Sequence, residues 1–239
     1  MSGSLLHVVA PLDRKLPAAL QVDIFADLVC PWSYLGKRRL EEALKAVKGP
    51  KLIHWHPFQL NPAIPAGGME FGRYLETKFG NRASVEPVLE QLTRLGKAEG
   101  IEFRFDLIKR VPNSVDAHCL MALGEKAKCN SMALAEDIYR AFFSEGRDIG
   151  QRAVLAEIAA RHGIDRERLD QSLNSGAARK RVLAAEAKAR KSGVRGVPAF
   201  LINRRVFVVG AQTPDNLIHV FDHAMFGDEE ETPANPVVH

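Results

Sequence analysis

The chain has 239 residues, of which 46% are hydrophobic and 26% charged, a composition typical of a globular protein with a sizeable core. Its net charge of +4 is too small to indicate nucleic-acid binding, and no stretch approaches the roughly 18 apolar residues of a membrane-spanning helix. The first residues lack the basic start of a signal peptide, and three cysteines without a close pair do not indicate a disulfide framework. We therefore expect a cytoplasmic protein with no nucleic-acid or membrane partner.

The first seventy residues predict a strand–helix–strand unit. In "QVDIFAD", Val22, Ile24 and Ala26 fall on one face of a strand. A helix is expected over 31–48, because apolar residues recur there at helical spacing until a Gly-Pro pair stops the pattern. "KLIHWHPFQL" predicts a second strand, and such a unit favours parallel pairing with a right-handed crossover.

The middle of the chain, residues 70–191, predicts successive helices with almost no strand pattern. Polar residues suited to the N-cap position precede several amphipathic stretches. The expected helix starts are Ser84, Ser114, Asn130 and Asp165. We expect this segment to form an all-helical domain.

Strand character returns near the C-terminal end in "PAFLINRRVFVVGA". Residues 199–202 and 206–209 flank a short turn and predict a β-hairpin. A last helix is expected after the N-cap Thr213, with Pro214 in its first position. The segments 1–17 and 228–239 are expected to be flexible.

The predicted order of elements is therefore β-α-β, a helical insertion, then β-β-α. This is the order of a thioredoxin-like α/β fold with a large all-helical domain inserted in the middle. Residues 18–69 and 192–227 would form the thioredoxin-like domain, and 70–191 the insertion.

Cys30 is placed where the first strand ends and the first helix begins. Free N–H groups and the helix dipole favour an anion at such a position and lower the pKa of a thiol. Pro31 suits the first turn because it has no N–H to leave unpaired. Since the thiolate is the nucleophile, the position predicts an activated cysteine, with a small buried core residue as the alternative.

A second motif is the "GVPAFLIN" segment, where Pro198 starts a predicted strand. Proline cannot donate to a strand ladder, and the glycines before it allow an unusual backbone approach. A cis peptide bond between Val197 and Pro198 fits this context.

Four motifs in this order resemble the DsbA-like branch of the thioredoxin superfamily, over about residues 20–225. "CPWSYLG" is similar to the redox-motif segment of that branch, and "GVPAFLIN" to the cis-proline strand that faces it. "VPNSVDAHCL" resembles the start of an inserted helix in the FrnE-like subgroup, and "VGAQTPDNL" resembles that group's end of the sheet and start of the last helix.

The resemblance implies roles for four residues. Cys30 matches the attacking cysteine of the C-P-x-C motif, and Pro198 matches the cis-proline, with Val197 presenting its backbone to an extended substrate. Ser33 stands where the family has the resolving cysteine, so the motif cannot close its own disulfide. Ser33 is expected to hydrogen-bond the thiolate or a bound sulfur, while glutathione or another thiol resolves a mixed disulfide.

The same segment resembles glutathione-using relatives, the kappa-class glutathione transferases and the 2-hydroxychromene-2-carboxylate isomerases, whose motif reads S-P-x-S. The likeness implies glutathione as a cosubstrate and no tightly bound cofactor. The residues expected to line a substrate or glutathione site are Pro31, Trp32, Phe58, Asn61, His118, Val197, Gln212 and Asp215. Of these, Asn61 would contact the glutathione peptide and Asp215 would bind the glutathione amine. His118 would line the pocket or relay protons.

Two further features leave alternatives open. Cys119 replaces an arginine common in the subgroup, and it is either a packing residue, like Cys129, or a thiol that resolves a Cys30 intermediate. His54 and His56 have a spacing that metal sites use, but no third ligand is apparent and no metal is expected.

Three functions fit these residues. The leading hypothesis is a thiol oxidoreductase with a single-cysteine CPWS active site, acting on small thiols or disulfides or on protein disulfides. The second is a glutathione-dependent isomerase or transferase of an aromatic or polyketide-like compound. The third is a non-catalytic thioredoxin-fold binding module. The sequence does not distinguish a monomer from a homodimer.

Overall fold

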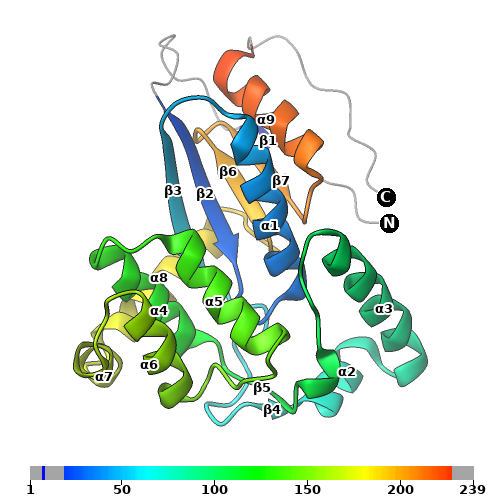
Figure 1. Cartoon of the computed structure of the whole chain (residues 1–239), viewed down its shortest axis with the longest axis vertical. Helices are drawn as coiled ribbons and strands as arrows, with labels where there is room; N and C mark the ends of the chain where they lie inside the picture. Colours follow the sequence, from blue (N-terminus) through cyan, green and yellow to red (C-terminus); the bar gives the residue numbers. More distant parts are fainter. Residues whose placement is uncertain (1–6, 9–18, 228–239) are drawn as a thin grey trace.

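The β-α-β unit at the start of the fold is confirmed. The computed structural model describes residues 7–8 and 19–227, and within them the main sheet has the strand order β1-β7-β6-β2-β3 (Figure 1). Strand β2 (Leu20–Ala26) and strand β3 (Lys51–Pro57) are joined by helix α1 (Pro31–Ala46). The two strands pair in parallel along their whole length.

The predicted hairpin is also present. Strands β6 (Ala199–Ile202) and β7 (Val206–Val209) pair antiparallel, and β6 runs antiparallel beside β2. The turn between them places Asn203 and Arg204 at φ angles of 49° and 57°, the left-handed conformation that tight hairpin turns require.

One terminal segment differs from expectation. Residues His7–Val8 form strand β1, which pairs antiparallel with β7, so the prediction of flexibility is wrong for these two residues. A strand of only two residues, held by backbone hydrogen bonds to the edge of the sheet, leaves no recognisable pattern in the sequence. The other residues predicted to be flexible, 1–6, 9–17 and 228–239, lie outside the described residues.

The segment between β3 and β6 is helical, as predicted. Its helices are α2 (Phe71–Phe79), α3 (Arg82–Ala98), α4 (Val115–Lys126), α5 (Ser131–Phe143), α6 (Arg152–Arg161), α7 (Arg166–Asn174) and α8 (Ala177–Lys191), with a 3-10 turn at Phe105–Leu107. Two short strands, β4 (Met69–Glu70) and β5 (Arg110–Val111), pair antiparallel within it. They were not predicted, because two residues are too few to show alternation.

Most of the predicted helix starts are correct. The predicted N-caps whose side chains accept a backbone N–H are Asn130, Asp165 and Thr213, the last at the start of α9 (Pro214–Phe226). Ser84 is wrong as a cap, because Asn81 takes that position and accepts the N–H of Ser84 at 3.0 Å. Ser114 occupies its N-cap position, but Asn113 accepts the Val115 N–H at 3.1 Å instead.

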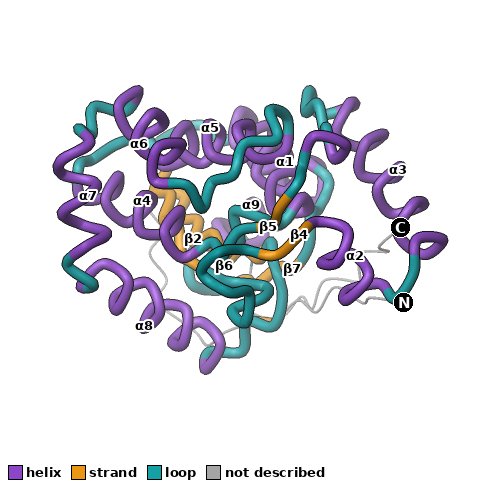
Figure 2. Tube along the Cα trace, turned by 90° about the horizontal axis from the view of Figure 1, so that it is seen from below, coloured by secondary structure: helices purple, strands orange, loops and turns teal. Residues whose placement is uncertain are grey.

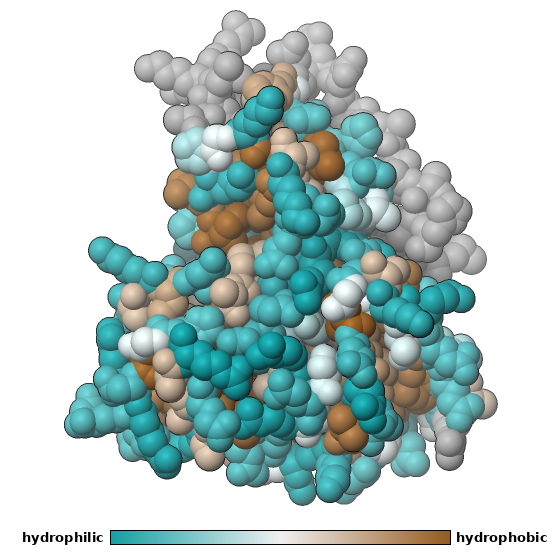
Figure 3. Space-filling view, viewed as in Figure 1, coloured by the Kyte–Doolittle hydropathy of each residue, from teal (hydrophilic) through white to brown (hydrophobic). Residues whose placement is uncertain are grey.

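The loop after β2 lies between the sheet and the inserted helices. Helices α1 and α9 lie side by side on one face of the sheet, over a core that includes Leu20, Val22 and Ile24 (Figure 1). The inserted helices gather at the carboxyl end of β2, with α4 to α8 on one side and α2 and α3 on the other (Figure 2). Hydrophilic side chains cover most of their visible surface (Figure 3), so their apolar residues face inward.

Candidate active site

Cys30 is the N-cap residue of α1, directly after the turn that ends β2. Its N–H donates to the Asp27 carbonyl oxygen at 3.1 Å. Its carbonyl oxygen accepts the N–H groups of Ser33 and Tyr34, at 3.0 and 3.2 Å. The first helical turn therefore begins at the cysteine, where backbone N–H groups favour negative charge.

The Val197–Pro198 segment faces this cysteine across the fold. The Val197–Pro198 peptide bond is cis, and the Cys30 thiol donates to the Val197 carbonyl oxygen at 3.9 Å. The proline ring packs against α1 at Gly36, where an added Cβ would lie 2.7 Å from Pro198 Cγ. The structure thus brings Cys30, Val197 and Pro198 together, although 167 residues separate the first two in sequence.

Burial sets the protonation of the thiol. Cys30 is 2% exposed, and this burial raises the pKa of its thiol above the usual value. The hydroxyl and N–H of Ser33 lower that pKa, the Asp27 carboxylate raises it, and the Lys78 ammonium lowers it. The balance is upward, so the predicted low pKa is wrong. Desolvation outweighs the helix N-terminus, and the resting thiol is neutral.

Ser33 lies in the first turn of α1, with only 1% of its surface exposed. Its Oγ has no hydrogen-bond partner among the described residues, although the hydroxyl lies close enough to Cys30 to lower the thiol's pKa. An unpaired buried hydroxyl is costly. It remains available to donate to a sulfur that carries negative charge.

The predicted binding residues near the helix start have different surroundings. Pro31 and Trp32 are half-buried in the first turn, and Trp32 packs against the core formed with the inserted helices. Asn61 is half-buried in the loop after β3, where its carbonyl oxygen accepts the Ile64 N–H at 3.2 Å.

Phe58 belongs to a different apolar cluster from Trp32. Its ring is 1% exposed and packs with Ala189 and Val194 under α8, and the Arg190 guanidinium lies 4.1 Å from the ring centroid. Phe58 contributes to the core between α8 and the sheet.

The two residues at the start of α9 also differ from each other. Gln212 is 8% exposed, and its Nε2 donates to the Val209 carbonyl oxygen at 2.8 Å, which closes the turn after β7. This amide therefore supports the local turn. Asp215 is exposed in the first turn of α9, where its carboxylate remains accessible to a cationic group.

Neither of the other cysteines forms a disulfide with Cys30, because all three thiols are free. Cys119 packs between α4 and α8 with Val182, and burial raises its pKa to about 11. This packing supports the role of a packing residue for Cys119, and no disulfide joins it to Cys30. Cys129 is half-buried and donates to the His162 carbonyl oxygen at 3.2 Å.

His118 does lie near Cys30, next to the turn that precedes it. It is 1% exposed, and its Nε2 is 3.6 Å from Oδ1 of Asp27. Two neighbouring residues were not predicted as site residues, Asp27 and Tyr139. The Tyr139 hydroxyl donates to the Asp27 carbonyl oxygen at 3.2 Å. Asp27 has one sequence signal, a carboxylate within the apolar run before Cys30; Tyr139, on α5, has none.

Helix α2 adds two further residues that the sequence did not indicate. Tyr74 is 9% exposed, and the Lys78 Nζ lies 3.4 Å from its hydroxyl. The charge of Lys78 lowers the pKa values of both Cys30 and Tyr74. A cation from the insertion thus acts on the thiol of the other part of the fold.

The paired histidines of β3 have a structural partner. The His56 Nε2 lies 2.7 Å from Asp23 Oδ1, and its ring stacks on Phe25 with centroids 4.8 Å apart. Within the described residues, no three or more His, Cys, Asp or Glu side chains are grouped as metal ligands.

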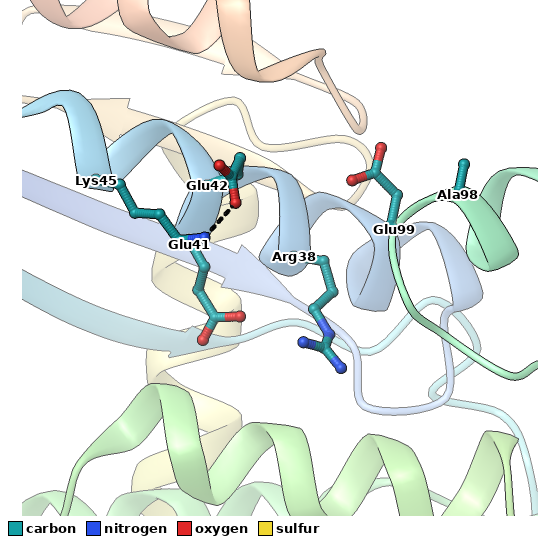
Figure 4. Close-up of a pocket in the computed structure, with 6 residues that line it drawn as sticks. All are labelled: Arg38, Glu41, Glu42, Lys45, Ala98 and Glu99. Carbon is teal, nitrogen blue, oxygen red and sulfur yellow. Dashed lines mark hydrogen bonds and ion pairs between the residues drawn. The ribbon is translucent and has the colours of Figure 1, made fainter.

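A polar pocket of about 550 Å³ lies elsewhere, between α1 and α3 (Figure 4). It is lined by Arg38, Glu41, Glu42, Lys45, Ala98 and Glu99. Its side chains come from α1 and from the C-terminal end of α3, and none of them is among the residues described around Cys30.

Comparison with known proteins identifies the family. The DSBA-like thioredoxin domain matches residues 21–222, and the chain belongs to this family. A crystal structure of a probable DsbA oxidoreductase from Streptomyces coelicolor is 28% identical with a TM-score of 0.79, and the match covers 91% of this chain and 94% of that one. The expected DsbA-like relationship and thioredoxin-like fold with a helical insertion are confirmed.

Two more distant structures share the fold. The cytosolic disulfide reductase DsbM from Pseudomonas aeruginosa with GSH is 20% identical with a TM-score of 0.58, over 86% of this chain and 95% of that one. A 2-hydroxychromene-2-carboxylate isomerase is 19% identical with a TM-score of 0.55, over 84% and 92%. No helix among the described residues is long and apolar enough to span a membrane.

Proposed function

We propose that this protein is a thiol–disulfide oxidoreductase that works through one cysteine, Cys30, with glutathione as its cosubstrate. The observation that carries the proposal is the position of the Cys30 sulfur, at the start of α1 and 3.9 Å from the Val197 carbonyl oxygen beside the cis-proline. Ser33, one helical turn on, has no thiol with which to form an intramolecular disulfide.

The chemistry takes two exchange steps. The Cys30 sulfur attacks a disulfide R–S–S–R′, which forms Cys30–S–S–R and releases R′–SH. A second thiol, such as glutathione, then attacks the mixed disulfide, forms a new disulfide with R and restores the Cys30 thiol. DsbM, which shares the fold, is described as a cytosolic disulfide reductase with GSH, and the cytoplasm is the compartment that supplies such a thiol.

Local groups suit these steps. The buried neutral thiol is protected until a substrate enters, because attack requires the thiolate. The Ser33 hydroxyl is free to donate to the sulfur as charge develops. The Val197 backbone borders the sulfur and would pair with an extended substrate, while half-buried Trp32 and Asn61 would contact its flanks.

A second candidate is a glutathione-dependent isomerase or transferase. The unpaired buried hydroxyl of Ser33 and the upward shift of the Cys30 pKa favour it, because both suit binding of a glutathione sulfur without attack by Cys30. The 2-hydroxychromene-2-carboxylate isomerase shares the fold. In this role the substrate would be an aromatic or polyketide-like compound.

The test is reduction of hydroxyethyl disulfide by glutathione, coupled to glutathione reductase. We expect turnover that Cys30→Ser lowers by at least about 100-fold and that Cys129→Ser leaves unchanged. Saturable calorimetric binding of reduced glutathione without turnover, retained in Cys30→Ser, would replace the oxidoreductase with the isomerase or transferase. Neither turnover nor glutathione binding would leave a non-catalytic binding module.

A further inference from the structure

The strongest unexplained feature near the cysteine is a buried acid–imidazole pair. Asp27 and His118 are each 1% exposed, and the Nε2 of His118 lies 3.6 Å from the Asp27 Oδ1. Asp27 lies in the turn between β2 and α1, whereas His118 comes from α4 of the insertion. The pair therefore spans the two parts of the fold, directly beneath the loop that carries Cys30.

Other contacts hold the carboxylate in place. The Oδ2 of Asp27 accepts the Leu60 N–H at 2.7 Å, and its Oδ1 accepts the Val29 N–H at 3.3 Å. Its backbone carbonyl oxygen accepts the Cys30 N–H at 3.1 Å. The carboxylate and the thiol are thus fixed in one turn, and their charges are coupled, since the Asp27 charge raises the pKa of Cys30.

The imidazole, in contrast, has unused hydrogen-bonding capacity. Neither ring nitrogen of His118 has a hydrogen-bond partner among the described residues, although the ring is buried. A buried polar group without a partner costs free energy, and such groups need a reason to persist. Proton exchange is a reason that fits an imidazole next to a carboxylate.

The other titratable groups around Cys30 cannot accept its proton. Tyr139, from α5, has a pKa raised well above its usual value by burial, and burial also raises the pKa of Tyr74, from α2. Both are therefore fully protonated at neutral pH. Lys78, also from α2, is a cation that donates toward Tyr74. Among the charged groups that act on the thiol in the described part of the chain, only the Asp27 carboxylate can accept a proton, and His118 is its partner.

We propose that the Asp27–His118 pair accepts the Cys30 proton when the sulfur attacks. In the exchange Cys30–SH + R–S–S–R′ → Cys30–S–S–R + R′–SH, the proton moves to the imidazole as the new S–S bond forms. The Asp27 carboxylate stabilises the resulting imidazolium. The imidazolium then returns the proton to the leaving R′ sulfur, so that no charge remains in the buried site.

This inference rests on the proposed function only for the identity of the electrophile. Because the thiolate is required for any attack, ionisation of Cys30 can be followed with iodoacetamide, a neutral alkylating agent. Mass spectrometry of the Cys30 peptide separates its rate from those of Cys119 and Cys129. The same measurement succeeds whether or not the protein turns over disulfides.

The test compares His118→Gln and Asp27→Asn with the unchanged chain across pH. At neutral pH we expect Cys30 alkylation to slow by at least about 10-fold in His118→Gln, because no acceptor remains. At alkaline pH, where the thiol ionises to solvent, the rates should converge. Asp27→Asn should show the same pH-dependent loss to a smaller degree. The imidazolium loses its counter-charge, but loss of the Asp27 charge also lowers the pKa of Cys30 and partly offsets the effect.

Cys119→Ser is the matched control. Cys119 follows His118 directly in α4, but its side chain packs against α8. This substitution should leave the Cys30 profile unchanged, and thermal unfolding of each variant verifies the fold. A His118→Gln profile that superimposes on the original would overturn the proposal. An equal loss of rate at every pH would overturn it as well, because that result marks a purely structural role. If the proton relay is intact while hydroxyethyl disulfide is not turned over, the proposed function fails and this inference stands.

Discussion

At the scale of single residues, the absent second cysteine determines the chemistry. Ser33 occupies the position one helical turn after Cys30, and its Oγ is buried without a partner. The variant Ser33→Cys should restore a redox pair. Upon oxidation it should lose two titratable thiols, while the unchanged chain loses none through an internal bond. Thiol titration after mild oxidation measures this directly, and a variant that keeps all four of its thiols would contradict the expectation.

The raised pKa of Cys119 has a consequence for stability. The thiol titrates near its ordinary value, about 8.5, in the unfolded chain and at about 11 in the folded one. Between these values the unfolded state binds fewer protons, so the free energy of unfolding should fall as pH rises through this window. Urea unfolding at several pH values should show a weaker decline in Cys119→Ala. An equal decline in both would contradict the assignment.

The site residues show what the sequence could predict at this scale. The position of Cys30 at a helix start, beside Val197 and Pro198, followed from short motifs. The pKa of the thiol did not, because burial depends on how the insertion closes over the loop. For the same reason the sequence could not show that Phe58 belongs to the core under α8, since only the packing of α8 shows which face of the strand end is covered.

At the scale of elements, the start of α1 is shaped to accept the cis-proline. An added Cβ on Gly36 would approach Pro198 Cγ to 2.7 Å. Gly36→Ala should therefore destabilise the protein by about 1–3 kcal/mol through overpacking, and slow Cys30 alkylation by moving Pro198. Chemical denaturation and alkylation measure the two effects. Gly67→Ala is the control, because nothing lies within 4 Å of its Cβ position; equal effects of the two substitutions would contradict the expectation.

A buried ion pair joins α1 to α5. The Lys37 side chain is 2% exposed, and its Nζ lies 2.5 Å from Glu136 Oε2, while the Tyr34 hydroxyl donates to Glu136 Oε1 at 2.7 Å. Glu136→Ala should lower the free energy of unfolding by about 2–4 kcal/mol, because it leaves a buried ammonium with weaker compensation. Urea denaturation tests this.

The control for that prediction is an ion pair within α1. The Glu42–Lys45 pair is 2.5 Å long but largely exposed (Figure 4). Glu42→Ala should change stability by less than about 1 kcal/mol, because solvent screens an exposed pair. If both substitutions cost the same, burial does not decide the strength of these pairs.

At the scale of the whole molecule, the insertion converts a helix-start cysteine into an enclosed one. Periodicity and stop signals were enough to predict the β-α-β unit, the hairpin and the nearly all-helical middle. They were not enough to predict which inserted helices meet Cys30, because these contacts are long-range. His118 from α4, Tyr139 from α5 and Lys78 from α2 converge on one loop only after the chain has folded.

The most direct test of the central claim is the intact mass of the reduced protein after incubation with glutathione disulfide. We predict one glutathione per chain, on the Cys30 peptide, removed by added reduced glutathione and absent in Cys30→Ser. A chain that stays unmodified at Cys30, or that is modified only at Cys129, would contradict single-cysteine exchange at this site.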